Sequence, residues 1–82
     1  MAEKRIKLQY FAGLREQRGC SEEEVETRAE TAEDLYRELS DRHGFEHPQS
    51  SLRVAVNDDF TGWDTRLKPG DLVVFIPPVS GG

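Results

Sequence analysis

Alternation of apolar and polar residues marks the first predicted element, which runs from Ile6 to Phe11. Every second residue from Ile6 to Tyr10 is apolar, and Phe11 breaks the alternation because it falls at a polar position. A period of two is typical of a β-strand with one buried face. We therefore predict a strand here, with the Phe11 side chain on the face opposite to that of Tyr10.

A weaker strand is predicted from Glu22 to Ala29, after a turn at Gly19-Cys20-Ser21. Val25 is its apolar anchor and Thr27 favours β-structure, while most of the other residues are charged. Charged side chains discourage pairing with another chain, so this strand suits the edge of a sheet.

A helix is predicted to begin at Thr31 and to end at Gly44. The Thr31 side chain can cap free backbone N–H groups, acids in the first turn favour the positive end of the helix dipole, and Gly44 can adopt the left-handed conformation that ends a helix. Apolar residues recur at helical spacing and give one stripe: Ala32, Leu35, Tyr36 and Leu39.

The segment after the helix contains a connector, a strand and a hairpin. Residues 45–51 form a polar connector that leads into an alternating strand at Leu52–Asn57. Asn57-Asp58-Asp59 predicts a hairpin-type turn, and a single apolar residue, Phe60, follows it.

The last strand, Leu72–Ile76, is apolar on both faces, which indicates a central position in the sheet. Pro69-Gly70 precedes it and suits the two central positions of a type II turn. One helix with a single apolar stripe must cover one face of the sheet, which predicts a two-layer α+β domain. We assign residues 1–76 to this domain and residues 77–82 to an extended tail that belongs to it.

Composition narrows the possible classes of protein. The chain has 82 residues, 35% of them hydrophobic, a net charge of −5 and one cysteine, which fits a small domain without disulfide bonds in a reducing compartment. Ten acidic residues lie in residues 21–47, so this surface repels phosphate backbones and nucleic-acid binding is not expected. We interpret the acidic stretch as a solvated helix face; a docking face for a basic partner is the alternative.

Neither a membrane segment nor a recognisable set of catalytic side chains is found in the sequence. The longest apolar run, Leu72–Ile76, is far shorter than the roughly 20 residues that span a bilayer, and the N-terminus has no apolar signal region. Cys20, His43 and His47 lack metal-ligand spacing, so no metal is predicted and their roles stay open. We expect a soluble, cytoplasmic protein.

The tail is the feature that points to chemistry. Pro77-Pro78 cannot donate backbone hydrogen bonds, so the sheet should stop at Ile76 and the tail should leave the domain extended, reaching roughly 20 Å at about 3.3–3.6 Å per residue. Gly81-Gly82 has no Cβ atoms and can enter a narrow channel, which would place the terminal carboxylate in a partner's active site. The alternative is a frayed terminus that happens to end in glycine.

A terminal carboxylate must be activated before it can react. Its ordinary pKa of about 3.3–3.7 leaves it ionised at neutral pH, and it is then a poor electrophile. Adenylation with ATP by another enzyme would supply a leaving group. A sulfur nucleophile could then take the glycyl carbonyl and give a thiocarboxylate, which is itself a sulfur nucleophile.

These features are similar, along essentially the whole chain, to those of the small subunits of molybdopterin synthase (MoaD type), which are sulfur carriers. The resemblance implies a ubiquitin-like β-grasp fold of the α+β class, with a mixed sheet of four to five strands packed on one main helix. The matching stretches are Ile6-Lys7-Leu8-Gln9-Tyr10-Phe11-Ala12 with Leu14-Arg15-Glu16, the helix from Thr31, Ala55-Val56-Asn57, Leu67 before Pro69-Gly70-Asp71, and the ending Pro77-Pro78-Val79-Ser80-Gly81-Gly82.

The resemblance also implies a cycle with three protein partners. An adenylating enzyme of the ubiquitin-activating type would use ATP on the carboxylate of Gly82, next to Gly81, and a sulfur donor protein would convert it to the thiocarboxylate. The large synthase subunit would receive the tail in a heterotetramer and pass the sulfur to cyclic pyranopterin monophosphate, forming the molybdopterin dithiolene. The small subunit would hold no permanent cofactor, and the catalytic residues would lie on the large subunit. Four further tail residues would contact the partner: Pro77, Pro78, Val79 and Ser80.

A docking patch is predicted on the sheet face opposite the helix. The family pattern turns Val73 and Phe75 inward, which leaves the alternate residues of the last strand outward. The predicted patch consists of Phe11, Arg15, Phe60, Val74 and Ile76. An apolar patch on a small domain usually marks an interface; the alternative is that the two phenylalanines close the ends of the core.

Two other functions stay open at this point. Thiamine thiazole synthesis, tRNA thiolation and conjugation to protein lysines use the same diglycine chemistry, although the chain length and the ending favour molybdopterin. A β-grasp interaction module without reactivity is the alternative from a different class.

Overall fold

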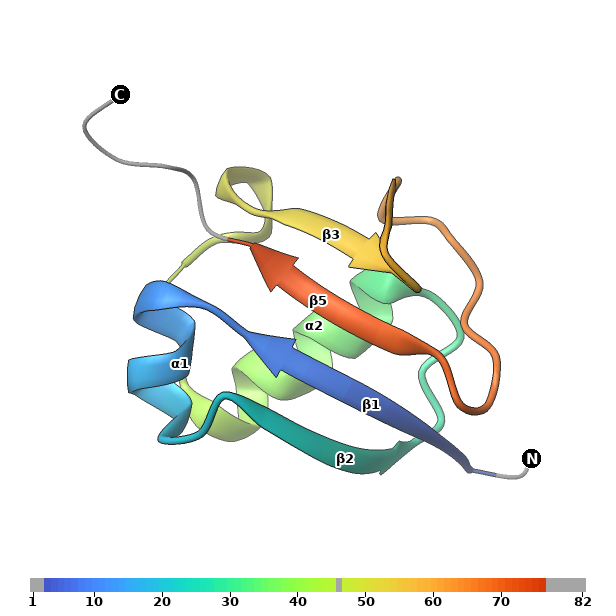
Figure 1. The fold of residues 1–82 in the computed structure, drawn as a ribbon, viewed down its shortest axis with the longest axis horizontal. Helices are drawn as coiled ribbons and strands as arrows, with labels where there is room; N and C mark the ends of the chain where they lie inside the picture. The colour runs from blue at the N-terminus through green and yellow to red at the C-terminus, as the bar shows by residue number, and fades with distance from the viewer. Residues whose placement is uncertain (1–2, 46, 77–82) are drawn as a thin grey trace.

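The computed structural model describes residues 3–45 and 47–76 (Figure 1). The elements of these residues are, in chain order, β1 (Lys4–Tyr10), α1 (Ala12–Arg18), β2 (Glu22–Thr27), α2 (Ala32–His43), the short 3-10 helix η1 (Gln49–Ser51), β3 (Arg53–Val56), β4 (Asp59–Thr61) and β5 (Leu72–Ile76). The predicted tail at 77–82 lies outside the described residues.

The strands form one mixed sheet in the order β2-β1-β5-β3-β4. β5 pairs in parallel with β1 and antiparallel with β3, and the other two pairings are antiparallel. α2 lies across one face of this sheet (Figure 1). The predicted two-layer α+β fold, the edge position of β2 and the central position of β5 are confirmed.

Helix α2 begins and ends as the sequence predicts. The Thr31 side chain accepts a hydrogen bond of 3.2 Å from the Asp34 backbone N–H, and Gly44 has a left-handed backbone with φ 69°. Two further N–H groups of the first turn donate to carbonyls of the 62–66 loop, so this end of the helix is held by the loop as well as by its cap. The predicted stripe is buried. Within the described residues, no helix is long and apolar enough to span a membrane.

The core between α2 and the sheet contains a group of packed aromatic rings. The Tyr36 ring contacts those of Phe45, Trp63 and Phe75, with centroid distances of 6.0, 5.8 and 5.0 Å. Phe45 is buried and also meets the Tyr10 ring edge-on at 5.8 Å. The prediction that residues 45–51 form a polar connector is therefore wrong at its first residue, because Phe45 folds back under the sheet and fills the core.

Helix α1 and η1 are absent from the predicted elements. α1 has seven residues and no side-chain cap, and its N-terminal flank, Phe11, still has extended backbone. A helix of this length is not stable by itself, and its sequence therefore carries only a weak helical pattern. It is held by tertiary contacts: Leu14 is fully buried in the core, and Gly19 ends the helix with a left-handed φ of 85°.

Both predicted turns are confirmed, and they are joined to each other. Asn57 and Asp58 have positive φ angles of 54° and 74°, as a two-residue hairpin of type I′ requires. Gly70 has φ 88°, which suits the third position of a type II turn. The Asn57 amide donates to the buried Asp71 carboxylate over 3.0 Å and accepts from the Leu72 N–H over 3.0 Å, so the hairpin is tied to the start of β5.

The burial of Phe45 gives a stability prediction. Phe45→Ala removes a buried ring that contacts the rings of Tyr10, Tyr36 and His43. The substitution should lower the free energy of unfolding by about 3–5 kcal/mol. Phe60→Ala removes the same side chain from an exposed site and should change the free energy of unfolding by less than about 1 kcal/mol. Urea denaturation followed by far-UV circular dichroism measures both values; equal losses would contradict the assignment of Phe45 to the core.

Candidate functional site

The tail begins at the end of β5, in the middle of the sheet. Ile76, the last described residue, pairs with Arg53 at the start of β3. On the other side, Phe75 pairs with Tyr10 at the end of β1, so Phe11 follows directly beside the tail's starting point. Figure 1 shows this edge of the molecule, where the end of β5 lies between the start of β3 and the start of α1. Any partner that receives the tail must therefore approach across these two flanks.

The sheet face that α2 leaves uncovered, here called the outer face, has an apolar and a polar half. The registers align Phe60, Ala55, Val74, Gln9 and Glu22 in one row across all five strands. The apolar half comprises β4, β3 and β5, and the polar half comprises β1 and β2. In the polar half, the Gln9 amide donates to Glu22 over 3.0 Å, and a second cross-strand pair joins β1 to β2 through an exposed ion pair.

The structure brings three of the predicted patch residues together on the apolar half. Phe60 is 64% exposed, and Ile76 is half-buried at the end of β5. Val74 also faces outward, outside the core cluster, but it is only 5% exposed because Ala55 and Gln9 flank it. Val74 therefore packs beneath the exposed residues of the patch, and little of its own side chain is accessible to a partner.

The other two predicted patch residues lie on the far side of β5. Phe11 is 45% exposed, and its extended backbone continues the alternation of β1, which turns its side chain away from Tyr10 and toward the outer face. Arg15 is exposed on α1, one turn further along the chain. The predicted patch is thus two groups, one on each side of the start of the tail.

Arg53 belongs to the same surface, although the sequence analysis did not select it. Its guanidinium lies over the Phe60 ring, with the guanidinium carbon 5.5 Å from the ring centroid. The signal was present in the sequence, because inward Leu52, Val54 and Val56 leave Arg53 facing outward at the first position of β3. The ring and the cation together form the exposed part of the apolar half.

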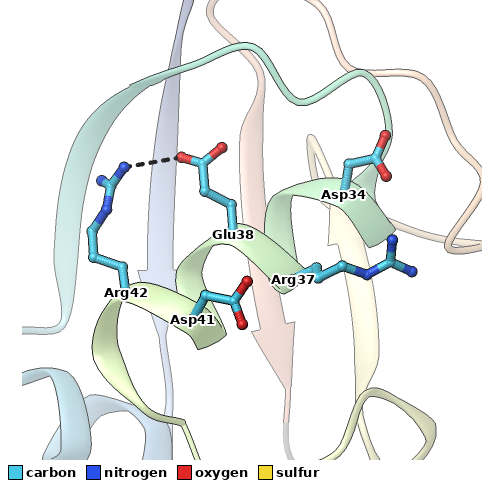
Figure 2. Close-up of a pocket in the computed structure, with 5 residues that line it drawn as sticks. All are labelled: Asp34, Arg37, Glu38, Asp41 and Arg42. Carbon is cyan, nitrogen blue, oxygen red and sulfur yellow. Dashed lines mark hydrogen bonds and ion pairs between the residues drawn. The ribbon is translucent and has the colours of Figure 1, made fainter.

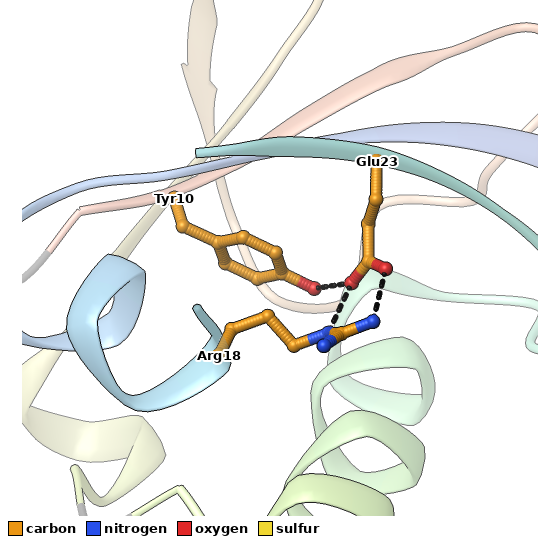
Figure 3. Close-up of polar contacts among 3 residues, drawn as sticks. All are labelled: Tyr10, Arg18 and Glu23. Carbon is orange, nitrogen blue, oxygen red and sulfur yellow. Dashed lines mark hydrogen bonds and ion pairs between the residues drawn. The ribbon is translucent and has the colours of Figure 1, made fainter. Parts of the chain in front are cut away.

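A partly buried polar cluster lies on the Phe11 side of this surface (Figure 3). The Tyr10 hydroxyl donates to the Glu23 carboxylate over 2.6 Å, and Arg18 donates two hydrogen bonds to the same carboxylate, from Nε over 2.9 Å and from an Nη atom over 2.7 Å. The three side chains come from β1, β2 and α1. The cluster ties the last residue of α1 to the sheet, and because α1 begins directly after Phe11, it helps to set where α1 lies.

The cluster also shifts the protonation of its members. Burial acts to raise the pKa of the Glu23 carboxyl, but the hydrogen bonds from Arg18 and Tyr10 outweigh it and hold this pKa below its usual value. Burial, and then the hydrogen bond to Glu23, raise the pKa of the Tyr10 hydroxyl. Glu23 is therefore a carboxylate and Tyr10 a neutral phenol at neutral pH, as this arrangement of donors and acceptor requires.

The exposed side of α2 is hollowed but has no reactive group in the hollow (Figure 2). Its lining residues are Asp34, Arg37, Glu38, Asp41 and Arg42. Arg42 pairs with Glu38 over 3.3 Å, one helical turn away, and exposed pairs of this kind contribute little to stability. Four acidic residues of the stretch lie on α2 and four lie on β2, so the interpretation of the stretch as a solvated helix face is confirmed only for the α2 part.

The remaining candidate side chains of the sequence analysis are dispersed. Cys20 is half-buried and packs against the core, and the His43 ring lies 5.7 Å from that of Phe45. The backbone carbonyl of His47 accepts a hydrogen bond from the Tyr36 hydroxyl. Within residues 3–45 and 47–76, no three histidine, cysteine, aspartate or glutamate side chains are grouped as metal ligands would be.

Together, a five-strand mixed sheet, one main helix and a tail that starts from the central strand define the ubiquitin-like β-grasp class. The structure titled "Caldiarchaeum Subterraneum Ubiquitin" superposes with a TM-score of 0.64, at 19% identity over 98% of this chain and 99% of that one. Residues 8–82 match the ThiS family. The chain belongs to the ThiS family.

Individual relatives within this class are named for molybdopterin synthesis. The molybdopterin synthase sulfur carrier subunit of Escherichia coli (strain K12) is 38% identical over 94% of this chain and 99% of its own. A putative molybdopterin converting factor, subunit 1, from Pyrococcus furiosus is 34% identical with a TM-score of 0.76, covering 93% of this chain and 99% of that one. In a complex of subunits 1 and 2 of the molybdopterin-converting factor from Helicobacter pylori, the matched chain is 25% identical with a TM-score of 0.64, over 95% of this chain and 99% of that one.

The lowered pKa of Glu23 gives a pH-dependent prediction. Glu23→Gln should lower the free energy of unfolding by about 1–3 kcal/mol at pH 7, because it removes hydrogen bonds to a charged acceptor. Since the pKa is lower in the folded state, this stabilisation is complete above the unfolded pKa of about 4.3 and is lost as the pH falls through the folded value. The difference between wild type and Glu23→Gln should therefore shrink on acidification.

Urea denaturation at a series of pH values between 7 and 3 measures this difference. Glu26→Gln is the matched control, because Glu26 lies on the same strand but pairs with Arg5 at an exposed site. Glu26→Gln should lower the free energy of unfolding at pH 7 by less than about 1 kcal/mol, because exposed ion pairs contribute little. A penalty for Glu23→Gln that stays constant down to pH 3 would contradict the assignment of the charge to Glu23.

Proposed function

We propose that this chain is a sulfur carrier of molybdopterin synthesis, which holds sulfur as a thiocarboxylate on Gly82. The observation that carries the proposal is the ThiS family match, which runs through residue 82 and so includes the diglycine ending, together with the carrier relative at 38% identity. The described part of the chain fits this role because β5, the strand that precedes the tail in the sequence, ends in the middle of the sheet next to exposed apolar surface. The folded domain would then bind the partner proteins, and the terminal carboxylate would be the reactive group.

In the proposed cycle, activation is performed by a partner. An adenylating enzyme of the ubiquitin-activating type joins the Gly82 carboxylate to AMP and releases pyrophosphate from ATP. A sulfur donor protein then supplies sulfur at the oxidation level of hydrosulfide, which bonds to the glycyl carbonyl carbon, displaces AMP and leaves the thiocarboxylate. We expect the catalytic groups for these steps on the partner enzymes.

In the second half of the cycle, the large subunit of molybdopterin synthase receives the tail. The thiocarboxylate sulfur passes to cyclic pyranopterin monophosphate, and two transfers complete the dithiolene. The complex of subunits 1 and 2 from Helicobacter pylori supports a partner of this kind. We place the contact on the outer face, where Phe11 and Phe60 flank the start of the tail, and we infer a heterotetramer with one carrier at each end of a large-subunit dimer.

The terminal carboxylate can be tested directly by intact mass spectrometry. Incubation with a competent activating enzyme, ATP and a sulfur donor should add the mass difference between sulfur and oxygen to the full chain. Deleting Gly82 should abolish this shift and molybdopterin formation while leaving far-UV circular dichroism and large-subunit binding unchanged. A thiocarboxylate formed without conversion of the precursor would assign the carrier to another pathway, and sulfur transfer by the truncated chain would contradict the proposed site.

The docking surface can be tested with single substitutions of its two phenylalanines. Phe60→Asp and Phe11→Asp should each weaken binding to the large subunit by about tenfold or more, because a charge replaces a buried aromatic contact. Phe60→Leu keeps the site apolar and should stay within a few-fold of wild type. Calorimetric titration measures the affinities, and unchanged binding by either aspartate variant would remove that residue from the interface.

A further inference from the structure

We propose that Arg53 is a specificity residue of the outer face, which recognises an aspartate or glutamate side chain on the protein that receives the tail. This inference rests on the proposed function, since it assumes that a partner covers the apolar half of the outer face. Its evidence is separate, and consists of the register, cation–π contact and pairing of Arg53 within the sheet.

The position of Arg53 places it inside the docking surface rather than at its rim. It pairs in register with Ile76, the residue from which the tail begins, and it is exposed on the outer face. Its guanidinium lies over the ring of Phe60, which is the most exposed large apolar side chain of the described residues. A partner that covers Phe60 and the start of the tail must therefore also cover Arg53.

The contact between the Arg53 guanidinium and the Phe60 ring is a cation–π contact and uses none of the guanidinium N–H donors as hydrogen-bond donors. A guanidinium over an aromatic ring is attracted through its flat face, so its N–H donors still point outward in the plane of the group. These donors form a rigid fork that matches the two oxygens of a carboxylate. Contact with the Phe60 ring thus reduces the number of orientations that the Arg53 guanidinium can adopt before a partner binds.

The two cations of β1 on the outer face lie opposite acidic residues, whereas Arg53 lies opposite an apolar one. In the registers of β1 and β2, Arg5 lies opposite Glu26 and Lys7 lies opposite Glu24. Arg53 lies opposite Ile76. Within residues 3–45 and 47–76, Arg53 makes no ion pair, while Arg5, Arg18, Arg37 and Arg42 each pair with a glutamate. The positive charge of Arg53 is therefore not neutralised by the described part of the domain.

Covering an unpaired guanidinium with an apolar partner surface would be unfavourable. A charge that loses its water without gaining an opposite charge is strongly destabilised. A partner carboxylate removes this penalty and forms a close charge pair in a water-poor interface, where such pairs couple strongly. A protein with the right apolar pocket but no carboxylate beside it would be rejected, which is how the residue confers specificity.

The test measures binding of full-length variants to the large subunit of molybdopterin synthase from the same organism. Arg53→Glu should weaken binding at least tenfold, and Arg53→Leu should weaken it as well, because it retains apolar contact but lacks the donors. Arg37→Glu is the matched control: it makes the same change in net charge on α2, behind the sheet, and should bind within a few-fold of wild type. Circular dichroism and thermal denaturation confirm that each variant is folded.

The outcomes separate this inference from the proposed function. If wild type fails to bind the large subunit or to accept sulfur, the proposed function fails. If wild type binds and Arg53→Leu binds equally well, or if Arg53→Glu and Arg37→Glu weaken binding equally, the carboxylate contact is overturned. Substituting the partner's acidic residues one at a time with lysine should identify one variant whose binding is restored by Arg53→Glu, and a complete scan without such a pair would also overturn it.

Discussion

β5 must be covered on both faces, because all five of its residues are apolar, and its backbone is paired along both edges, with β1 and with β3. Its inward residues Val73 and Phe75 are fully buried against α2, and outward Val74 is covered by its neighbours on β1 and β3. Burying such side chains contributes roughly 1.5–3 kcal/mol each, which is large for a small domain. β5 also joins the β1–β2 pair to the β3–β4 pair, so the sheet depends on this one strand for its continuity.

The surface around the tail follows from that central position. A strand in the middle of the sheet ends between two neighbours, so the tail starts with Phe11 on one flank and Arg53 on the other. The two flanks are fixed by different interactions. The Tyr10–Glu23–Arg18 cluster holds the first through α1, and pairing between β3 and β5 holds the second. A partner thus meets two separately supported groups with the root of the tail between them.

Sequence patterns predicted the elements in which local signals and tertiary burial agree. Alternation located β1 and β3, a continuous apolar run located β5, and the cap and stripe of α2 defined its ends. The patterns failed where tertiary contacts decide the conformation. α1 is held by one buried leucine and a glutamate from β2, and Phe45 is buried although polar residues follow it. Arg53 was passed over because its importance comes from its cross-strand neighbours. The roles predicted for residues 77–82 stay predictions, since these residues lie outside the described part.

The acidic edge of the sheet has a consequence for how copies of this chain meet. Glu22, Glu24 and Glu26 are exposed on β2, the strand at one end of the sheet. Two copies that joined edge to edge through β2 would bring these rows of carboxylates face to face, and like charges directly opposite each other destabilise strand pairing. The edge therefore opposes growth of the sheet by self-association. A protein that exposes apolar surface for others to bind is in this way kept from binding itself through that edge.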